Sequence, residues 1–436
     1  MSDHAEAIGN LLGYSTDEGY MKYEPVLNLY DTNNGQYNDA RLSFDTKALI
    51  NSWIDYHNSH IETKLRLTGV ALDANVGVAI KNGVYNAISS LQLTINDANV
   101  INNDYLPPYN SFRMYLAGDK EWADTHGDLY HFSQDDGTFD NTVATNSGFK
   151  NRVEILNLIR EDTGVTALTT SFTFTLRIPL KMIHPFFEAL DRPLINARMQ
   201  AVFKISGVNG DRFFPIVASN ATLAQSLSII GPNRWVCYRC EFHPDTAIKI
   251  NSNLSKGLVV NTNYWQAKHF KSNVDMTLPN QDFTITPGIR RARRVVCMFQ
   301  NESDWSSNVK CSPSLTDYRN KFTESNLEIN NERVYQQNIE GDYDHYKLLQ
   351  REMFSGEDQN SNGCLVPYRS FLKKTYAYYV YNISQSKHIL KDPNASVQLR
   401  LIAKKTGDTS ELHMFVEQEV DVTINMTTSE VMKTGD

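Results

Sequence analysis

The sequence predicts an all-β protein built from two copies of one module. Apolar and polar residues alternate with the period of a half-buried strand along most of the chain. Helical patterns are few and short, so βαβ units are not expected. A motif in residues 90–100 (SLQLTINDANV) recurs in residues 325–335 (SNLEINNERVY), which indicates a duplication.

The first strand of interest is residues 90–95. Leu91, Leu93 and Ile95 alternate with polar residues, so we expect them to face a core, followed by a turn at Asn96-Asp97. Other strands are expected where the same alternation recurs. These segments are residues 61–67, 171–180, 196–205, 375–383, 396–405 and 420–426.

Four segments carry helical signals: residues 5–14, 46–57, 179–191 and 342–354. Pro185 lies inside the third, so we expect that helix to be broken. The stretches 103–151 and 302–323 read as long irregular loops, which in compact domains are usually functional or interaction surfaces.

The duplication depends on two matches in the same order. Leu93-x-Ile95-Asn96 followed by Val100 corresponds to Leu327-x-Ile329-Asn330 followed by Val334. A second pair of segments shares Asn-Ala-x-(Met or Val)-Gln before a strand, beginning at Asn196 and at Asn394. Either match alone is weak, but their common order favours a repeated module.

Length and charge limit the classes of function. A chain of 436 residues accommodates two β domains of about 200 residues each. The net charge of -8 argues against general affinity for nucleic acid, and the first 40 residues contain seven acids and one Lys. No apolar run approaches the roughly 18 residues of a membrane span, and no signal peptide is visible, so synthesis in the cytosol is expected.

Searches for chemical sites favour ordinary structure over catalysis. No nucleotide-binding, zinc-protease or nucleophile-elbow motif is present, and no pair of carboxylates can be placed for glycoside hydrolysis. We therefore expect no enzyme activity, no catalytic or metal-binding residues and no cofactor. A cluster of acids and histidines is interpreted as a solvated loop rather than a metal site; it comprises His126, Asp128, His131, Asp135, Asp136 and Asp140.

Two smaller groups are interpreted in the same way. His57 and His60, with Asp55, are expected in a polar connection before a strand at Ile61. The five cysteines are an odd number and are expected to be free thiols; they are Cys237, Cys240, Cys297, Cys311 and Cys364. Cys237 and Cys240 are three residues apart on an expected strand, which would place their sulfurs on opposite faces and argues against zinc.

The only basic run is RRARR, which contains Arg290, Arg291, Arg293 and Arg294. Pairing with acids of a neighbouring subunit is the favoured interpretation. A plain solvated surface and contact with a genome remain open as alternatives.

The order of segments in the second half resembles the double jelly-roll major capsid proteins of polinton-like viruses, adintoviruses and virophages, in the lineage of the adenovirus hexon. The segments that carry the resemblance are CEFHPDTAIKINSNLSKGLVV, ITPGIRRARRVVCMFQNES, NKFTESNLEINNERV, YDHYKLLQREMF, VPYRSFLKKTYAYYVYNIS and NASVQLRLIAKK. In the first half, KNGVYNAISSLQLTINDANV and LRIPLKMIHPFFEALDRPLINARMQ are similar to the same proteins.

This resemblance implies two tandem eight-stranded jelly-roll sandwiches with short connecting helices. A composition break at residues 228–235 is the expected boundary. We expect an N-terminal arm in residues 1–40. A first jelly roll is expected in residues 41–230, with a tower loop at about 103–151. A second is expected in residues 231–436, with a loop at about 302–323.

The implied function is that of a major capsid protein, whose pseudo-hexagonal homotrimers tile an icosahedral virus shell. The expected partners are neighbouring capsomers, penton and minor or cement proteins and, as an open possibility, an internal membrane; sequence-specific binding of nucleic acid is not expected. The alternative is a β-sandwich spike or minor capsid protein that binds a receptor or a carbohydrate.

Overall fold

The computed structural model describes most of the chain. The described residues are 21–33, 35–37, 39–68, 78–135, 146–161, 171–206, 216–218, 226–274, 278–300, 320–353, 365–373, 376–407 and 411–435. The expected helix at residues 5–14 and nearly all of the expected loop at 302–323 lie outside them.

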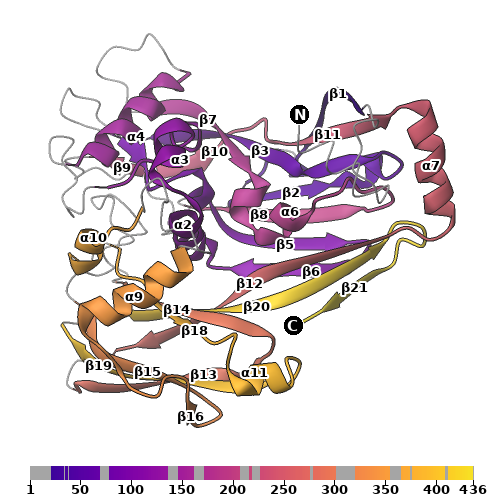
Figure 1. Cartoon of the computed structure of the whole chain (residues 1–436). Helices are drawn as coiled ribbons and strands as arrows, with labels where there is room; N and C mark the ends of the chain where they lie inside the picture. The colour runs from indigo at the N-terminus through magenta and orange to yellow at the C-terminus, as the bar shows by residue number, and fades with distance from the viewer. Residues whose placement is uncertain are drawn as a thin grey trace.

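Two antiparallel sheets form the first sandwich (Figure 1). One sheet has the order β1 (Met21–Tyr30), β11 (Arg234–Phe242), β3 (Ile54–Thr68) and β7 (Ser171–Pro179), and β10 (Ser226–Ile229) pairs with β3 on the β11 side. The other has the order β2 (Arg41–Asp45), β8 (Met199–Ile205), β5 (Ile88–Ile95) and β6 (Ala98–Asp104). A small separate sheet pairs β4 (Val78–Ile80) with β9 (Ile216–Ala218).

The second sandwich repeats this arrangement. Its first sheet has the order β12 (Val259–Asn273), β20 (Glu411–Asn425), β14 (Ala292–Gln300) and β18 (Tyr379–Asn382), with β21 (Val431–Thr434) also on β20. Its second sheet has the order β13 (Asn280–Ile289), β19 (Val397–Thr406), β15 (Lys321–Ile329) and β16 (Glu332–Arg333), with β17 (Ile339–Glu340) also on β15.

The strand order identifies the topology of both sandwiches. The strands of each half can be numbered along the chain, with β10 and β11 counted as one interrupted strand and with β4, β9, β17 and β21 left out. One sheet of each half then has the order 1-8-3-6 and the other the order 2-7-4-5. This is the order of a jelly roll made of two Greek keys. The all-β prediction with two tandem jelly rolls is therefore confirmed.

The repeated motif marks equivalent hairpins. Asn96 and Asp97 connect β5 to β6 with φ of 47° and 67°, and Asn330 and Asn331 connect β15 to β16 with φ of 51° and 64°. Two successive left-handed residues are typical of a type I′ hairpin turn, and Asn and Asp tolerate this conformation well. The carboxamide of each leading Asn also accepts a backbone hydrogen bond from the seventh strand, at 2.8 Å from Arg198 N and 2.9 Å from Gln398 N.

The second match identified the right strands in the wrong register. The match aligns Met199 with Val397. In the structure Met199 pairs with Ile95, and the equivalent of Ile95 in the second half, Ile329, pairs with Leu399. The true equivalent of Met199 is therefore Leu399. A shift of two residues leaves every side chain on the same face of a strand, so the alternation of apolar residues cannot distinguish the two registers.

The helices differ in part from those expected. α5 (Leu180–Ile183) and α6 (Pro185–Ala189) form the broken helix, and α9 (Gly341–Met353) is the helix predicted from Asp342. The segment 46–57 instead forms one 3-10 turn, η1 (Thr46–Leu49), before β3 begins at Ile54. The remaining short helices are η2 (Val84–Ala87), α10 (Tyr368–Leu372) and α11 (Lys387–Lys391).

The expected tower loop at 103–151 is largely helical, which corrects that prediction. It contains α2 (Leu106–Ala117), α3 (Lys120–Thr125), η3 (Asp128–Tyr130) and the start of α4 (Ser147–Leu158). Leu106, Tyr109, Phe112 and Tyr115 of α2 are all buried. Their spacing of three residues is a helical signal that the two prolines at the start of the helix obscured.

The first jelly roll extends beyond the expected domain limits on both sides. β1 lies within the range 1–40 and pairs with β11, which begins beyond residue 230. The helix α7 (Pro244–Ser255) then leads from β11 to β12. The composition break at 228–235 coincides instead with the interruption between β10 and β11.

The hairpin at Asn330 provides a test of the role of its turn. We expect Asn330→Ala to destabilise the protein by about 2 kcal/mol, because Ala loses the hydrogen bond from Gln398 and disfavours positive φ. Asn330→Gly, which loses only the hydrogen bond, should cost about 1 kcal/mol. Chemical denaturation of both variants measures the difference, and equal losses would contradict the role of backbone conformation.

Candidate functional site at the interface between the two jelly rolls

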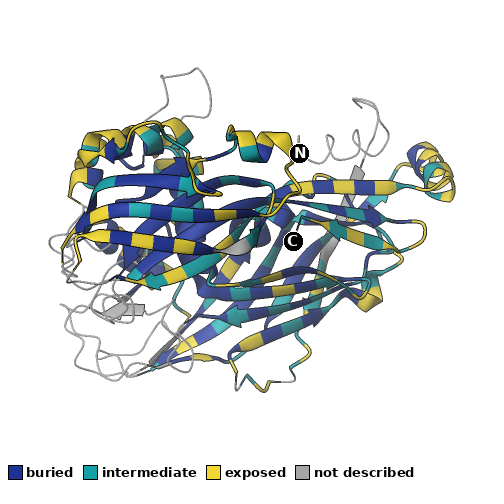
Figure 2. Ribbon diagram, turned by 90° about the horizontal axis from the view of Figure 1, so that it is seen from below, coloured by how far each residue is buried: buried dark blue, intermediate teal, exposed yellow. Residues whose placement is uncertain are grey.

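The central strands of the second jelly roll are covered on both faces. All residues from Leu412 to Gln418 of β20 are buried, as are all those from Arg294 to Gln300 of β14. Residues of a sandwich strand normally alternate between core and solvent, so continuous burial requires a second cover. The first jelly roll supplies that cover: its helix α2 lies against the sheet that contains β14 and β20 (Figure 1). Exposed residues gather on the outer helices and alternate with buried ones along several of the strands (Figure 2).

The start of α2 stacks on two histidines of the second jelly roll. Tyr105 lies 4.1 Å from His269 and 5.2 Å from His413, measured between ring centres, with interplanar angles of 8°. His269 Nε2 and His413 Nδ1 are 3.1 Å apart, and Glu411 lies 3.5 Å beyond His413 Nε2. Tyr105 has φ of 66°, a conformation that is unfavourable for a bulky residue and must be fixed by its surroundings.

These two histidines are held in the neutral form. Burial, His413 and Lys271 together lower the pKa of His269 to about 3. Burial also lowers the pKa of His413, although Glu411 acts in the opposite direction. The stack therefore favours imidazole over imidazolium on both rings.

A buried ion-pair cluster lies under the middle of α2. Arg294 of β14 places Nε 2.6 Å from Glu417 Oε2 and Nη1 2.9 Å from Glu352 Oε2. Tyr109 of α2 donates its hydroxyl to Glu417 Oε1 at 2.7 Å, and the Arg294 guanidinium lies 5.4 Å from the centre of the Phe112 ring. Burial opposes the charge on Arg294, but Glu417, Tyr109 and Glu352 together outweigh it and raise the pKa of the guanidinium.

Further polar contacts join the two jelly rolls along β6 and β12. Gln266 donates to Asn103 Oδ1 at 2.5 Å, and Tyr264 donates to the carbonyl of Val100 at 3.4 Å. The asparagines that mark the two sequence matches in the first half, Asn96 and Asn196, also contact the second jelly roll. Asn96 donates to the carbonyl of Ser429, and Asn196 donates to that of Met426, at 2.9 and 2.7 Å.

A second buried ion pair joins Asp135, in the segment between α3 and α4, to Arg152 of α4. Arg152 Nη2 lies 2.6 Å from Asp135 Oδ1, and both side chains have no exposed surface. The backbone N–H of Asp135 donates to the Tyr376 hydroxyl of the second jelly roll at 3.1 Å, and the ring of Tyr376 lies 4.7 Å from that of Tyr115. This segment is therefore part of the interface.

The interpretation of the acid and histidine cluster as a solvated loop is corrected at two positions. Asp135 pairs with Arg152, and His131 is 6% exposed, with a pKa that burial lowers to about 4. Asp128 begins η3 and His126 ends α3, whereas Asp136 and Asp140 lie outside the described residues. Within the described ranges, no group of three or more His, Cys, Asp or Glu side chains is placed to hold a metal ion.

Two arginines of the basic run pair within their own chain, which corrects the expected pairing with a neighbouring subunit. Arg291 contacts Glu419 and Asp421, and Arg294 contacts Glu352 and Glu417. Arg293 lies over the ring of Trp265 at 5.2 Å, and Arg290 is exposed.

His57 and His60 lie inside β3 and not in a connection before it.

Cys237 and Cys240 of β11 are free and buried, and burial raises the pKa of Cys240 to about 12. The pairing of β11 with β3 shifts between Val236 and Tyr238, so simple alternation does not describe this pair of cysteines. Cys297 is also free and buried, and Cys311 and Cys364 lie outside the described residues.

None of the described helices has the length and apolar character needed to span a bilayer.

We expect Glu417→Ala to destabilise the protein by about 3–5 kcal/mol, because it leaves Arg294 buried without its nearest carboxylate and Tyr109 without its acceptor. Lys404→Ala, which removes the exposed pair with Glu324, should cost less than about 1 kcal/mol and is the control. The double variant Arg294→Met, Glu417→Met should be more stable than Glu417→Ala. Denaturation midpoints measure all three, and equal losses for Glu417→Ala and Lys404→Ala would contradict the role of the cluster.

The histidine stack predicts a loss of stability in acid. The pKa of His269 is depressed in the folded state, so its contribution is complete above about pH 6.5 and declines as the pH falls toward about 3. His269→Phe keeps a ring beside Tyr105 but removes this titration. Between pH 7.5 and pH 5 the variant should therefore lose up to about 2 kcal/mol less unfolding free energy than the natural sequence. Identical pH profiles in urea titrations would refute the assignment.

Comparison with known proteins agrees with this architecture. No protein-family model matches the sequence, and no curated protein sequence is significantly similar to it. A chain of the Sputnik virophage, solved by cryo-EM, has a TM-score of 0.59 at 10% sequence identity, covering 96% of this chain and 89% of that one. The mavirus major capsid protein has a TM-score of 0.57 at 12% identity, covering 94% and 90%.

The capsid of the virus PBCV-1 gives a TM-score of 0.53 at 10% identity, covering 95% of this chain and 97% of that one. Such low identities show similarity of fold and leave function to be argued separately. The similarity spans both jelly rolls and not one sandwich alone. The chain therefore has the double jelly-roll fold found in major capsid proteins of virophages and giant viruses.

Proposed function

We propose that this chain is a major capsid protein whose homotrimers form the pseudo-hexagonal tiles of an icosahedral virus shell. The observation that carries the proposal is the presence of two jelly rolls of identical strand order in one chain. Three such chains around a threefold axis supply six similar units, which is what hexagonal tiling needs. A binding module or an enzyme has no comparable need for two copies of one sandwich.

The interface between the two jelly rolls supports a tile with fixed geometry. The hydrogen bonds from Tyr109 to Glu417 and from the Asp135 backbone to Tyr376, and the stack of Tyr105 on His269, connect elements of both rolls. Each contact depends on a specific geometry, so a change in the angle between the rolls would leave buried polar groups such as the Tyr109 hydroxyl without a hydrogen-bond partner. A shell needs this property, because its units must meet their neighbours at defined positions.

The same proposal extends to partners and location. The protein would be made in the cytosol of a host cell and would reside in the virion shell, in contact with neighbouring capsomers and with penton and minor or cement proteins. An internal membrane remains an open partner. Sequence-specific binding of nucleic acid is not proposed, since the net charge is -8 and Arg291 and Arg294 are paired with acids of their own chain.

The mass of the purified chain in solution tests this proposal. We expect light scattering after gel filtration to give three times the chain mass of 49.6 kDa, or larger shells, and electron micrographs to show six-cornered particles. Dilution should not dissociate a trimer held by large apolar interfaces. A monomer that persists at high concentration would argue against the capsid role and favour a receptor-binding or carbohydrate-binding spike.

A further inference from the structure

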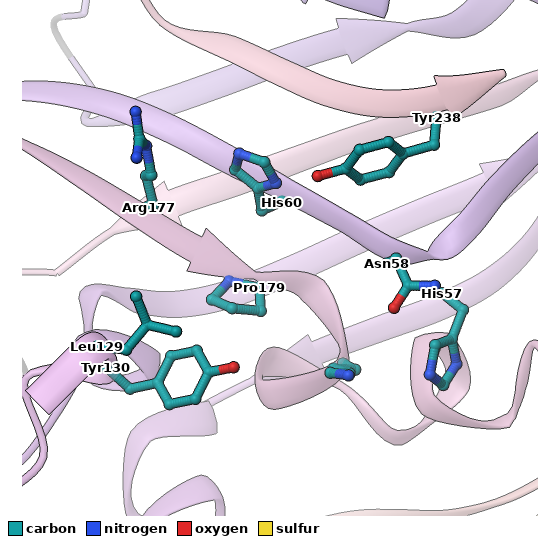
Figure 3. Close-up of a pocket in the computed structure, with 9 residues that line it drawn as sticks. His57, Asn58, His60, Leu129, Tyr130, Arg177, Pro179 and Tyr238 are labelled. Carbon is teal, nitrogen blue, oxygen red and sulfur yellow. The ribbon is translucent and has the colours of Figure 1, made fainter. Parts of the chain in front are cut away.

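A pocket opens on the outer face of the sheet that contains β3, β7 and β11 (Figure 3). Its volume is about 450 Å³, which is within the usual range for small-ligand sites. The residues that line it are His57, Asn58, His60, Leu129, Tyr130, Arg177, Pro179, Lys181 and Tyr238. None of the interactions between the two jelly rolls described above involves these residues.

The charge of the pocket is opposite to that of the protein. The chain has 50 acids and 42 Lys and Arg, yet no Asp or Glu is among the nine described residues that line this pocket. Arg177 and Lys181 supply cationic groups. Two carboxylates lie beside the lining: Glu62 lies between Arg177 and Arg234, and Asp55 accepts hydrogen bonds from Asn58. Because Lys181 adds a third cation, the site remains positive. Such a concave cationic site attracts anions selectively.

The two histidines provide hydrogen-bonding groups rather than fixed charge. Burial lowers the pKa of His60, which is therefore neutral at pH 7. The Nδ1 atom of His57 is buried and has no hydrogen-bond partner among the described residues. This nitrogen lies beneath the surface of the pocket, so the hydrogen-bonding capacity that a ligand meets comes from other groups in the wall. The carboxamide of Asn58 lies in the same wall (Figure 3).

Aromatic and apolar side chains form the remaining walls. Tyr130 and Tyr238 lie on opposite sides of the pocket, with Pro179 between them and Leu129 beside Tyr130 (Figure 3). Leu129 is 70% exposed. Rings and prolines of this kind pack against the C–H faces of a sugar, whereas a bare anion would gain nothing from them.

We propose that this pocket binds an acidic saccharide, a sugar ring that carries a carboxylate or a sulfate group. Arg177 and Lys181 would contact the anionic group, Asn58 the hydroxyls, and Tyr130 and Tyr238 the faces of the ring. This activity would add ligand recognition to the side of the first jelly roll and does not depend on the oligomeric state proposed above.

The test compares three probes that share one sugar core: 3′-sialyllactose, a sulfated lactose and lactose. Saturation-transfer NMR and calorimetry on the full chain should show dissociation constants at least tenfold lower for an acidic probe than for lactose. The two acidic probes distinguish a carboxylate ligand from a sulfate ligand. Equal affinity for lactose would overturn the proposal, as would inorganic sulfate displacing the acidic probe at equal concentration.

Variants locate the binding site. Lys181 is partly exposed on α5, and Lys181→Glu should weaken binding of the acidic probe at least tenfold. Lys249→Glu makes the same change of charge on an exposed residue of α7, outside the pocket, and should leave affinity unchanged. A circular dichroism melt confirms that both variants fold. If Lys181→Glu binds as tightly as Lys249→Glu, the pocket is not the binding site and the proposal fails.

Discussion

The structure depends on covering both faces of the sheet that contains β14 and β20. One face packs on the core of the second jelly roll, and the other carries Phe415, Glu417 and His413, which contact α2 of the first. Without α2, a buried aromatic surface and two charged groups would be exposed or unpaired. The second jelly roll is therefore complete only when the first is present, and the two form one cooperative unit rather than two linked domains.

Polar groups determine how this interface fits together. Apolar packing alone tolerates many small shifts, whereas Tyr109 of the first jelly roll must reach Glu417, which Arg294 holds in place from within the second. Removing these charges from water is costly, so the cluster contributes less to stability than its short distances imply. Its main contribution is a single relative orientation of the two jelly rolls. The left-handed backbone of Tyr105 is consistent with this view, because that strain persists only where the surroundings fix it.

Much of the fold could be predicted from the sequence, because alternation of apolar residues records which face of a strand is buried. Leu91, Leu93 and Ile95, and the turn at Asn96, are found as the pattern indicates. Alternation does not record register, which explains the error of two residues at Val397. It also does not record tertiary partners, so the polar character of Asp135 and Arg294 pointed to solvent or to a neighbouring subunit. The partners of Arg294, Glu352 and Glu417, are distant in sequence, and Asp135 and Arg152 are separated by the turn into α4, so only the folded chain brings these charges together.

The strand order has a consequence for how the chain reaches this state. β1 pairs with β11, roughly 200 residues later, and β12 pairs along its whole length with β20, near the end of the chain. Bringing such distant strands together lowers the entropy of the chain before the strand contacts that offset this loss have formed, so folding should be slow. During synthesis, β1 leaves the ribosome long before its partner exists. The first strand of each jelly roll therefore has an unpaired edge until its partner strand has been synthesised. During this interval the nascent chain is most prone to aggregate.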